Sequence, residues 1–378
     1  MKEGLKIFTI FGIDVRLHYS WWPIFILLSW SLSTAFFPAY FPGHQPSTYW
    51  LMGMLAALLL FISVLLHEFS HSMVASFNKI RVRSITLFFF GGVASIDAED
   101  MKPTTEFLMA IAGPLFSLVL GGILYLIHQN NVNGIITAIT FYLYQLNLLL
   151  ALFNLVPGYP LDGGRAFRAL LHAYYRDLLK ATAIASAVGK IFAGFLMAVG
   201  IISIFIGTGS GLWLALIGGF LYIMAGLSYN QVQAKKILDG LKVKDLMRKN
   251  IPKVSPQMNL SEFVKAYANL EDNVFSVADD QFKGLLDVNL IGPVKLESQR
   301  KIKLRQLSIP LKNLAMVKPT DSAYKAFKLI NASKNGLAPV SSNGKLAGVI
   351  TERSLLNRIA WELKFRGQGR SGNSRVNH

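Results

Sequence analysis

The 378-residue sequence contains no cysteine. This absence excludes disulfide bridges, thiolate metal ligands and a cysteine nucleophile, so any metal site has to be built from histidine and carboxylate side chains. Charge is also scarce, because Asp, Glu, Lys and Arg together make up 16% of the residues, against about 25% in an ordinary soluble domain. Hydrophobic residues reach 52%. The composition therefore indicates a membrane protein rather than a soluble globular one.

Acidic residues are fewer than basic ones, and the basic excess is concentrated at one end. Residues 1–240 carry 14 Lys and Arg and 10 Asp and Glu, whereas residues 241–378 carry 24 and 11. This contrast predicts a membrane domain over 1–240 and an appended water-soluble domain behind it. Positive charge can serve nucleic-acid binding, but anionic lipid head groups also attract Lys and Arg to the cytoplasmic side of membrane proteins. We favour the lipid explanation and expect no nucleic acid as a partner.

Six hydrophobic stretches are long enough to cross a bilayer, which takes about 20 mainly apolar residues in a helix. They are residues 19–37, 50–77, 105–128, 134–153, 181–206 and 211–232. The connections 38–49, 129–133 and 207–210 contain no Lys or Arg, whereas the segments on the other side do. By the positive-inside rule, this alternation predicts that both termini lie in the cytoplasm, and we expect the cell membrane as the location.

The connection 78–104 contains the apolar run ITLFFFGGVASI, which is too short to span the membrane and is interrupted by Gly91 and Gly92. One interpretation is a re-entrant β-hairpin that dips into the membrane, with protein or a cavity satisfying its backbone groups. The other is an apolar loop at the interface. Periodicity alone leaves both interpretations open.

Three ionisable residues, His67, Glu68 and His71, lie within five positions of the second hydrophobic stretch. Positions i and i+4 share one face of a helix, so both imidazoles can reach a single metal ion, and zinc suits a site of histidines and a carboxylate. Glu68 can then take a proton from zinc-bound water. An HExxH sequence also occurs by chance, but ionisable residues within a membrane helix are costly and usually functional.

A catalytic zinc site needs a third protein ligand, and Asp162 is the candidate. It follows the helix-stopping sequence PGYP at 157–160. The alternative is that Asp162 caps a helix starting near Ala166. The second hydrophobic stretch runs inward, which places His67 about 26 Å along it at 1.5 Å per residue, near the cytoplasmic surface of a core about 30 Å thick. The fourth stretch also runs inward and delivers Asp162 to the same side, which favours the ligand.

Four motifs together resemble the site-2 protease family of intramembrane metalloproteases. They are HEFSH in a membrane helix, FGGVA in the following connection, AGP at 112–114 and NLVPGYPLDGGR at 154–165. The resemblance covers about residues 12–235 of the sequence. The expected fold is accordingly a multi-pass α-helical membrane protein with six transmembrane helices and a re-entrant β-hairpin.

The family resemblance implies a role for each residue of the site. One zinc ion per chain would be bound by His67, His71 and Asp162, with Glu68 as the catalytic acid and base. Asn154 would lie beside the active site, where it holds substrate or stabilises the oxyanion.

The resemblance also implies what the protein acts on. The function would be that of a zinc endopeptidase that cleaves transmembrane segments of other membrane proteins, so a substrate helix and the lipid bilayer are the expected partners. The hairpin with Gly91 and Gly92 would pair with an unwound substrate strand, which favours the hairpin interpretation of the connection 78–104. Strand addition compensates the backbone groups that unwinding releases.

Two other functions remain open. A zinc-binding scaffold without protease activity has no need of Glu68, which is present here. A metal or proton transporter predicts polar residues spread through several helices, whereas here they converge on one site. Lys190 in the fifth stretch has two readings, because its side chain can extend to the cytoplasmic interface or face the active-site cavity.

A faint repeat with an offset of 63 residues follows the membrane part. Val254-Ser255-Pro256 recurs as Val317-Lys318-Pro319, and each copy precedes an amphipathic helix and apolar strands. The pattern resembles a pair of CBS modules, which we place at 241–305 and 306–362. We therefore expect a cytoplasmic α/β unit, followed by a disordered basic Gly/Ser-rich tail over 363–378.

CBS pairs often bind an adenine nucleotide through a Thr and an Asp after the last strand of each copy. The first copy has Asp287 and Leu290 at these positions, and the second keeps Thr351 but has Ser354 for the Asp. These departures weigh against nucleotide binding. The alternative is a module for dimerisation or substrate positioning, and a homodimer through the CBS pair is the corresponding partner.

Overall fold

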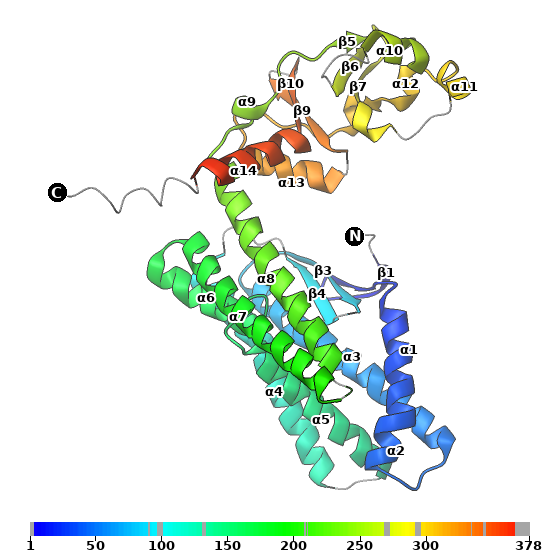
Figure 1. Cartoon of the computed structure of the whole chain (residues 1–378), viewed down its shortest axis with the longest axis vertical. Coiled ribbons are helices and arrows are strands. Elements are labelled where there is room, and N and C mark those ends of the chain that lie inside the picture. Colours follow the sequence, from blue (N-terminus) through cyan, green and yellow to red (C-terminus); the bar gives the residue numbers. More distant parts are fainter. Residues whose placement is uncertain are drawn as a thin grey trace, which may run out of the picture. The chain divides into compact units, whose positions relative to one another are not determined.

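The structure is a computed structural model that describes residues 4–89, 91–96, 101–130, 134–207, 209, 211–267, 273–291, 296–333, 335–342 and 345–366. It divides into two compact units, Met1–Val232 and Gln233–His378 (Figure 1). Residues 363–366 of the predicted disordered tail belong to a helix, Glu352–Arg366, so the predicted start of the tail is wrong by four residues. From residue 367 onward the tail lies outside the described residues, so its predicted disorder stays a prediction.

Within the described ranges, six helical segments are long and apolar enough to cross a membrane, which confirms the six predicted spans. The first consists of α1 (Trp21–Ser31), the π-helical segment η1 (Leu32–Phe36) and α2 (Phe37–Tyr40). The others are α3 (Pro46–Phe77), α4 (Pro103–Gln129), α5 (Gly134–Asn154), α7 (Leu178–Phe205) and α8 (Gly211–Asp239). Helix α8 continues beyond the predicted end at residue 232 and crosses from the first unit into the second.

Local sequence explains where several of these helices begin. Pro46 and Pro103 are the first residues of α3 and α4, positions where the missing N–H of proline has no helical partner to lose. Asp177 precedes α7 and accepts hydrogen bonds from the backbone N–H groups of Leu179 and Lys180, as a helix-capping carboxylate does.

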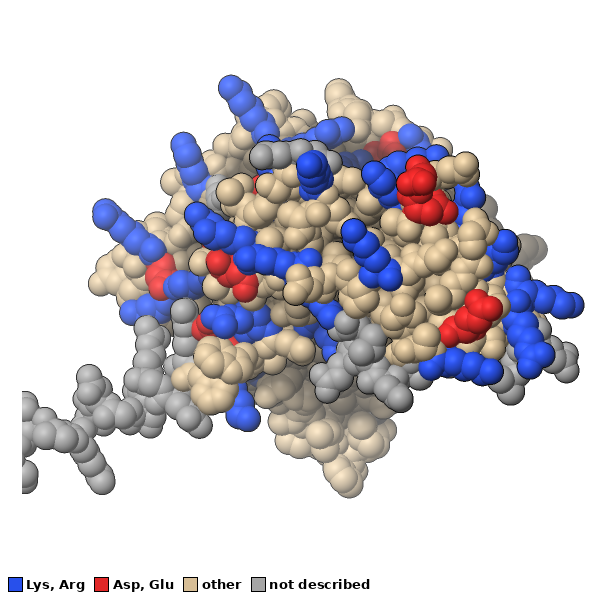
Figure 2. Space-filling view, turned by 90° about the horizontal axis from the view of Figure 1, so that it is seen from above, with Lys and Arg blue, Asp and Glu red and all other residues tan. Residues whose placement is uncertain are grey.

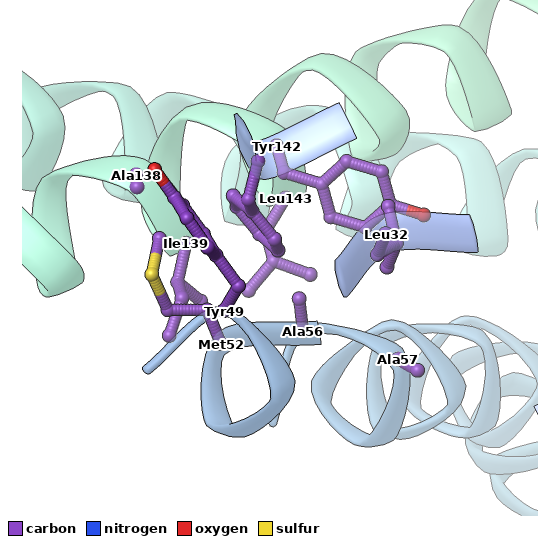
Figure 3. Close-up of a cluster of buried hydrophobic side chains, with 10 residues drawn as sticks. Leu32, Tyr49, Met52, Ala56, Ala57, Ala138, Ile139, Tyr142 and Leu143 are labelled. Atoms are coloured by element: carbon purple, nitrogen blue, oxygen red, sulfur yellow. The ribbon is translucent and has the colours of Figure 1, made fainter. Parts of the chain in front are cut away.

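Part of the helix bundle packs through a cluster of buried apolar side chains from η1, α2, α3 and α5 (Figure 3). Met52, Ala56 and Ala138 are fully buried within it, and Tyr142 packs beside them. Small residues let membrane helices approach closely. Gly53 shows this directly, because a Cβ there would collide with the backbone of α1 at Ser29.

A four-stranded sheet forms in the first unit from two hairpins. Its order is β1 (Leu5–Ile10), β2 (Ile13–Leu17), β3 (Val82–Phe88) and β4 (Gly91–Ile96). The β3–β4 hairpin is the one predicted in the connection 78–104, while its entry into the membrane stays a prediction. Strands β2 and β3 pair in parallel, from Asp14 opposite Ser84 to Leu17 opposite Leu87, so β4 is an edge strand. The sheet lies at the same end of the bundle as α6 (Asp162–Tyr175) (Figure 1).

The second unit contains two copies of a strand–helix–strand pattern. The first copy has β5 (Lys253–Val254), α10 (Leu260–Tyr267), β6 (Val274–Ala278), β7 (Lys283–Asp287), η2 (Val288–Leu290), α11 (Leu296–Gln299), α12 (Leu304–Leu307) and β8 (Ile309–Pro310). Around the second copy are α9 (Val243–Leu246), η3 (Leu311–Asn313), α13 (Ala323–Ser333), β9 (Leu337–Ser342), β10 (Lys345–Thr351) and α14 (Glu352–Arg366).

The strand pairing repeats with the same 63-residue offset as the sequence. Val254 pairs in parallel with Val277, and Val317 forms a parallel bridge with Val340. Two short helices lie in corresponding positions of the repeat. Val243 of α9 is buried in the core of the second copy, and Leu304 of α12 is buried in the core of the first copy. Figure 2 shows Lys and Arg side chains scattered over the visible face with fewer Asp and Glu, in keeping with the basic composition of residues 241–378.

Candidate metal centre

Helix α3 presents His67 and His71 on one face, toward α4 and α6. Both histidines are 3% exposed. Each Nε2 atom lies 3.2 Å from the same atom, Oδ2 of Asp162. The three candidate ligand atoms lie within 4.8 Å of one another, so the structure brings together the three residues that the sequence proposes as metal ligands.

The second nitrogen of each imidazole is held by α4. Nδ1 of His71 lies 2.5 Å from the carbonyl oxygen of Met109, and Nδ1 of His67 lies 2.9 Å from the hydroxyl of Ser117. A carbonyl only accepts, so Nδ1 of His71 must donate. A histidine that donates from Nδ1 keeps the lone pair of Nε2 for a metal, the usual arrangement around protein-bound zinc.

Asp162 is the first residue of α6, whose predicted start near Ala166 is therefore wrong by one helical turn. Its carboxylate lies against the two histidines. Burial raises the pKa of the Asp162 carboxyl, but the contacts with His67 and His71 outweigh burial and lower the pKa below its usual value. A carboxylate binds a metal in its ionised form.

The distances from Asp162 to the two histidines fit a zinc ion. Bonds of about 2.0–2.1 Å at a tetrahedral angle place neighbouring ligand atoms about 3.3 Å apart, and both N–O distances here are 3.2 Å. Gly113 of α4 leaves the necessary space, because a Cβ there would lie under 3.0 Å from the Nε2 atoms of both His67 and His71. The donor set and this opening agree with the predicted zinc site.

The three residues open into a cavity of about 820 Å³. Glu68 also lines this cavity, one residue along α3 from His67. Gly92 of β4 lies directly against the Glu68 side chain, since a Cβ on Gly92 would be 2.5 Å from Cγ of Glu68. The absence of a side chain at position 92 therefore lets the sheet approach the carboxylate.

The edge strand β4 forms one wall of the cavity through Gly91, Gly92, Val93, Ala94 and Ile96. Asn154, at the end of α5, also faces the cavity, and its Nδ2 donates to the carbonyl of Leu150 at 3.0 Å. All seven residues singled out from the sequence thus line the same cavity.

Sequence reasoning missed several polar residues of this cavity. Glu106 of α4 and Arg168 of α6 form a buried ion pair there, and the guanidinium of Arg168 lies 4.9 Å from the ring centroid of Tyr159. Arg165 lies 3.6 Å from Oδ1 of Asp162. An acidic residue at the start of a membrane helix was the available signal for Glu106, but its partner could not be identified without the packing of α6 on α4.

Lys190 is not among the residues that line the cavity. Its Nζ lies 5.5 Å from the ring centroid of Tyr222 on α8 and beside Gly226. The side chain therefore packs between α7 and α8, which disfavours the role at the active-site cavity.

A second cavity of about 420 Å³ lies in the second unit, between the two copies. Asp287 and Thr351 both line it. The Asp287 carboxylate is buried and accepts from the backbone N–H and the side chain of Asn289, at 2.9 and 3.0 Å. Ser354 donates to the carbonyl of Thr351 at 2.8 Å. The side chain of Leu290, the fourth position considered, lies outside the described part of the chain.

Comparison with known proteins gives two family matches. Residues 55–135 and 127–199 match Peptidase family M50, and residues 305–360 match the CBS domain. The sequence is 33% identical over 364 residues to a Synechocystis sp. protein described as a zinc metalloprotease, covering 94% of this chain and 95% of that protein. It is 29% identical over 369 residues to the zinc metalloprotease Rip3 of Mycobacterium tuberculosis, covering 95% and 93%.

Among solved structures, the site-2 protease from Methanocaldococcus jannaschii is similar, with 32% identity and a TM-score of 0.40. That similarity covers 59% of this chain and 94% of the solved chain.

Proposed function

Because the chain belongs to the M50 peptidase family of zinc metalloproteases, which includes the site-2 proteases, we propose that it cleaves transmembrane segments of membrane proteins at a zinc site formed by His67, His71 and Asp162. The observation that carries this proposal is the meeting of the three ligand atoms, within 4.8 Å, in one cavity with Glu68. A zinc-binding scaffold without protease activity would not need the Glu68 carboxylate.

Zinc, when bound, polarises the scissile carbonyl and makes water more acidic. Glu68 accepts the proton of the attacking water on its carboxylate and passes it to the nitrogen of the leaving amine as the C–N bond breaks. The Asn154 amide holds the substrate or its developing oxyanion. The Nδ1 contacts of His67 and His71 keep the two imidazoles in place during this sequence.

The substrate presents an unwound segment to the edge of β4. A helical segment has its carbonyls engaged in hydrogen bonds and must unwind before attack. Strand β4 is an edge strand and lines the catalytic cavity, so its free backbone groups can pair with the released strand. Gly91 and Gly92 allow that strand to come close to Glu68.

We place the active site on the cytoplasmic side of the cell membrane, with both termini in the cytoplasm. The support is the clustering of Lys and Arg at the sheet end of the helix bundle, as in the connection 78–104 and the segment 154–180, and their absence from the connections at the other end.

The role of Glu68 is tested by Glu68→Gln in the full chain, purified in detergent with a transmembrane substrate. Cleavage is expected to fall by about 100- to 10,000-fold, the usual contribution of proton transfer by a positioned side chain. Zinc content by metal analysis is expected to stay near one per chain. Undiminished cleavage would remove Glu68 from the mechanism.

The role of Asp162 is tested separately by Asp162→Ala. Loss of one of three protein ligands is expected to weaken zinc binding by at least about 100-fold, which exceeds the usual effect of changing a residue behind a ligand. The measurement is competition with a chelator of known affinity. Unchanged, tight zinc binding would exclude Asp162 from the ligand set.

For the second unit, we propose a regulatory role through the cavity between its two copies. Arg248, Thr351 and Arg353 line that cavity and suit a phosphate, whereas the buried Asp287 opposes one. Titration of the full chain with ATP and AMP, measured by calorimetry, distinguishes a nucleotide-binding module from a dimerisation module. Saturable binding that Thr351→Ala weakens supports an adenine nucleotide, and no heat of binding leaves a dimerisation module.

A further inference from the structure

A buried ion pair joins α4 to α6 beside the metal centre. Nε of Arg168 lies 2.8 Å from Oε1 of Glu106, and the terminal Nη2 contacts the same oxygen. The side chain of Glu106 is 4% exposed and that of Arg168 is 14% exposed. Removing either of two such buried charges destabilises the protein, because the other charge is left buried and unpaired.

This ion pair completes a ring of contacts around the metal site. Arg168 lies six residues after Asp162 on α6, about 9 Å along the helix. Glu106 lies one turn before Met109 on α4, whose carbonyl holds Nδ1 of His71 at 2.5 Å. His71 in turn contacts Asp162 at 3.2 Å. Helix α4 thus contacts His71 directly, through the carbonyl of Met109. It also contacts α6, the helix that carries Asp162, through Glu106.

The segment before Asp162 lies against α7, where the backbone N–H of Tyr159 donates to the carbonyl oxygen of Ala185 at 3.1 Å. It runs through Pro157, Gly158, Tyr159 and Pro160 outside any helix, and α6 is a 14-residue amphipathic helix outside the candidate membrane spans. Arg168 also reaches this segment, since its guanidinium faces the ring of Tyr159. One side chain therefore contacts both α4 and the segment that leads into Asp162.

We propose that Glu106 and Arg168 are positioning residues that set Asp162 against His67 and His71. This inference rests on the proposed role of Asp162 as a zinc ligand. Neither residue touches the ligand atoms. They act through the placement of α6, so their removal loosens the third ligand while both histidines keep their own contacts with α4.

The test is a double-mutant cycle on zinc affinity in the full chain in detergent, measured by chelator competition. Arg168→Met and Glu106→Gln are each expected to weaken zinc binding by about 10–100-fold, the usual effect of changing a residue behind a ligand. The double variant is expected to lose less than the product of the two single effects, because no charge stays unpaired. Arg168→Lys keeps the charge and is expected to recover part of the affinity.

A matched control comes from the second unit. Arg358 and Glu362 form an ion pair at 2.7 Å whose acidic side chain is 5% exposed, and Arg358→Met is expected to leave zinc affinity unchanged. The visible absorption of the Co²⁺-loaded protein gives a second readout, because a displaced carboxylate changes the ligand field whereas a loss of global stability does not. Arg168→Met and Arg358→Met are expected to differ in this spectrum.

Unchanged zinc affinity and an unchanged Co²⁺ spectrum in both single variants would overturn the positioning role, and so would single effects that simply multiply in the double variant. If Asp162→Ala weakens zinc binding and the pair variants do not, this inference fails alone. If Asp162→Ala leaves zinc binding unchanged, the proposed metal site fails first and the positioning role with it.

Discussion

Gly113 faces both imidazoles from α4, so the metal site depends on a missing side chain as well as on the ligands. A Cβ at this position would lie where the two Nε2 atoms converge. The neighbouring atoms belong to histidine rings that are 3% exposed and held at Nδ1. These rings have little freedom to move aside, and a methyl group there competes with the metal for space.

We therefore expect Gly113→Ala to weaken zinc binding by at least about 100-fold, a larger effect than that of changing a residue behind a ligand. Gly122→Ala is the matched control, because it makes the same change on the same helix with nothing within 4 Å of the added Cβ. Chelator competition on both proteins is the measurement. Equal zinc affinity in the two variants would contradict the geometry described for Gly113.

At the same scale, the sequence identified the candidate ligands but not what holds them. His67 and His71 could be paired because i and i+4 share a helical face whatever surrounds the helix. Ser117 and the carbonyl of Met109 could not be found in this way, since their roles depend on the register between α3 and α4. An ordinary backbone carbonyl also leaves no trace in the sequence.

At the scale of elements, the membrane helices could be predicted because length and hydrophobicity alone define them. The β1–β2 hairpin could not be predicted in the same manner. All six residues of β1 are exposed, so it lacks the alternation of a half-buried strand. Strand β2 also joins β3 across more than sixty residues of sequence, a pairing that no local pattern encodes.

The edge strand β4 supports a prediction of its own. Successive backbone N–H groups of a strand point to opposite edges, so Val93→Pro and Ala94→Pro differ in the edge they affect. The variant whose proline faces β3 is expected to disturb the hairpin. The other should fold and bind zinc normally but cleave about tenfold more slowly, because it loses about 1 kcal/mol of backbone pairing and its ring blocks the substrate strand.

Zinc affinity, thermal unfolding and cleavage of a transmembrane substrate distinguish the two proline variants. If both variants retain zinc and cleave at the original rate, the free edge of β4 does not receive the substrate.

At the scale of the whole molecule, the placement of charge and the placement of the site were inferred from different residues. The connections without Lys or Arg define one side of the membrane. The meeting of Asp162 with His67 and His71 requires α3 and α5 to end on the same side, opposite those connections. Both arguments assign the metal centre to the positively charged side.

The missing cysteines make this topology directly measurable. Single cysteines at the exposed positions His44 and Asn130, in the uncharged connections, are expected to react with a membrane-impermeant maleimide in right-side-out vesicles. Cysteines at the exposed positions Lys79 and Gln257 are expected to react only after the vesicles are opened. The unmodified chain provides a background of zero, because it has no thiol. Labelling of position 79 in sealed vesicles would place the metal centre on the outer side and overturn the cytoplasmic assignment.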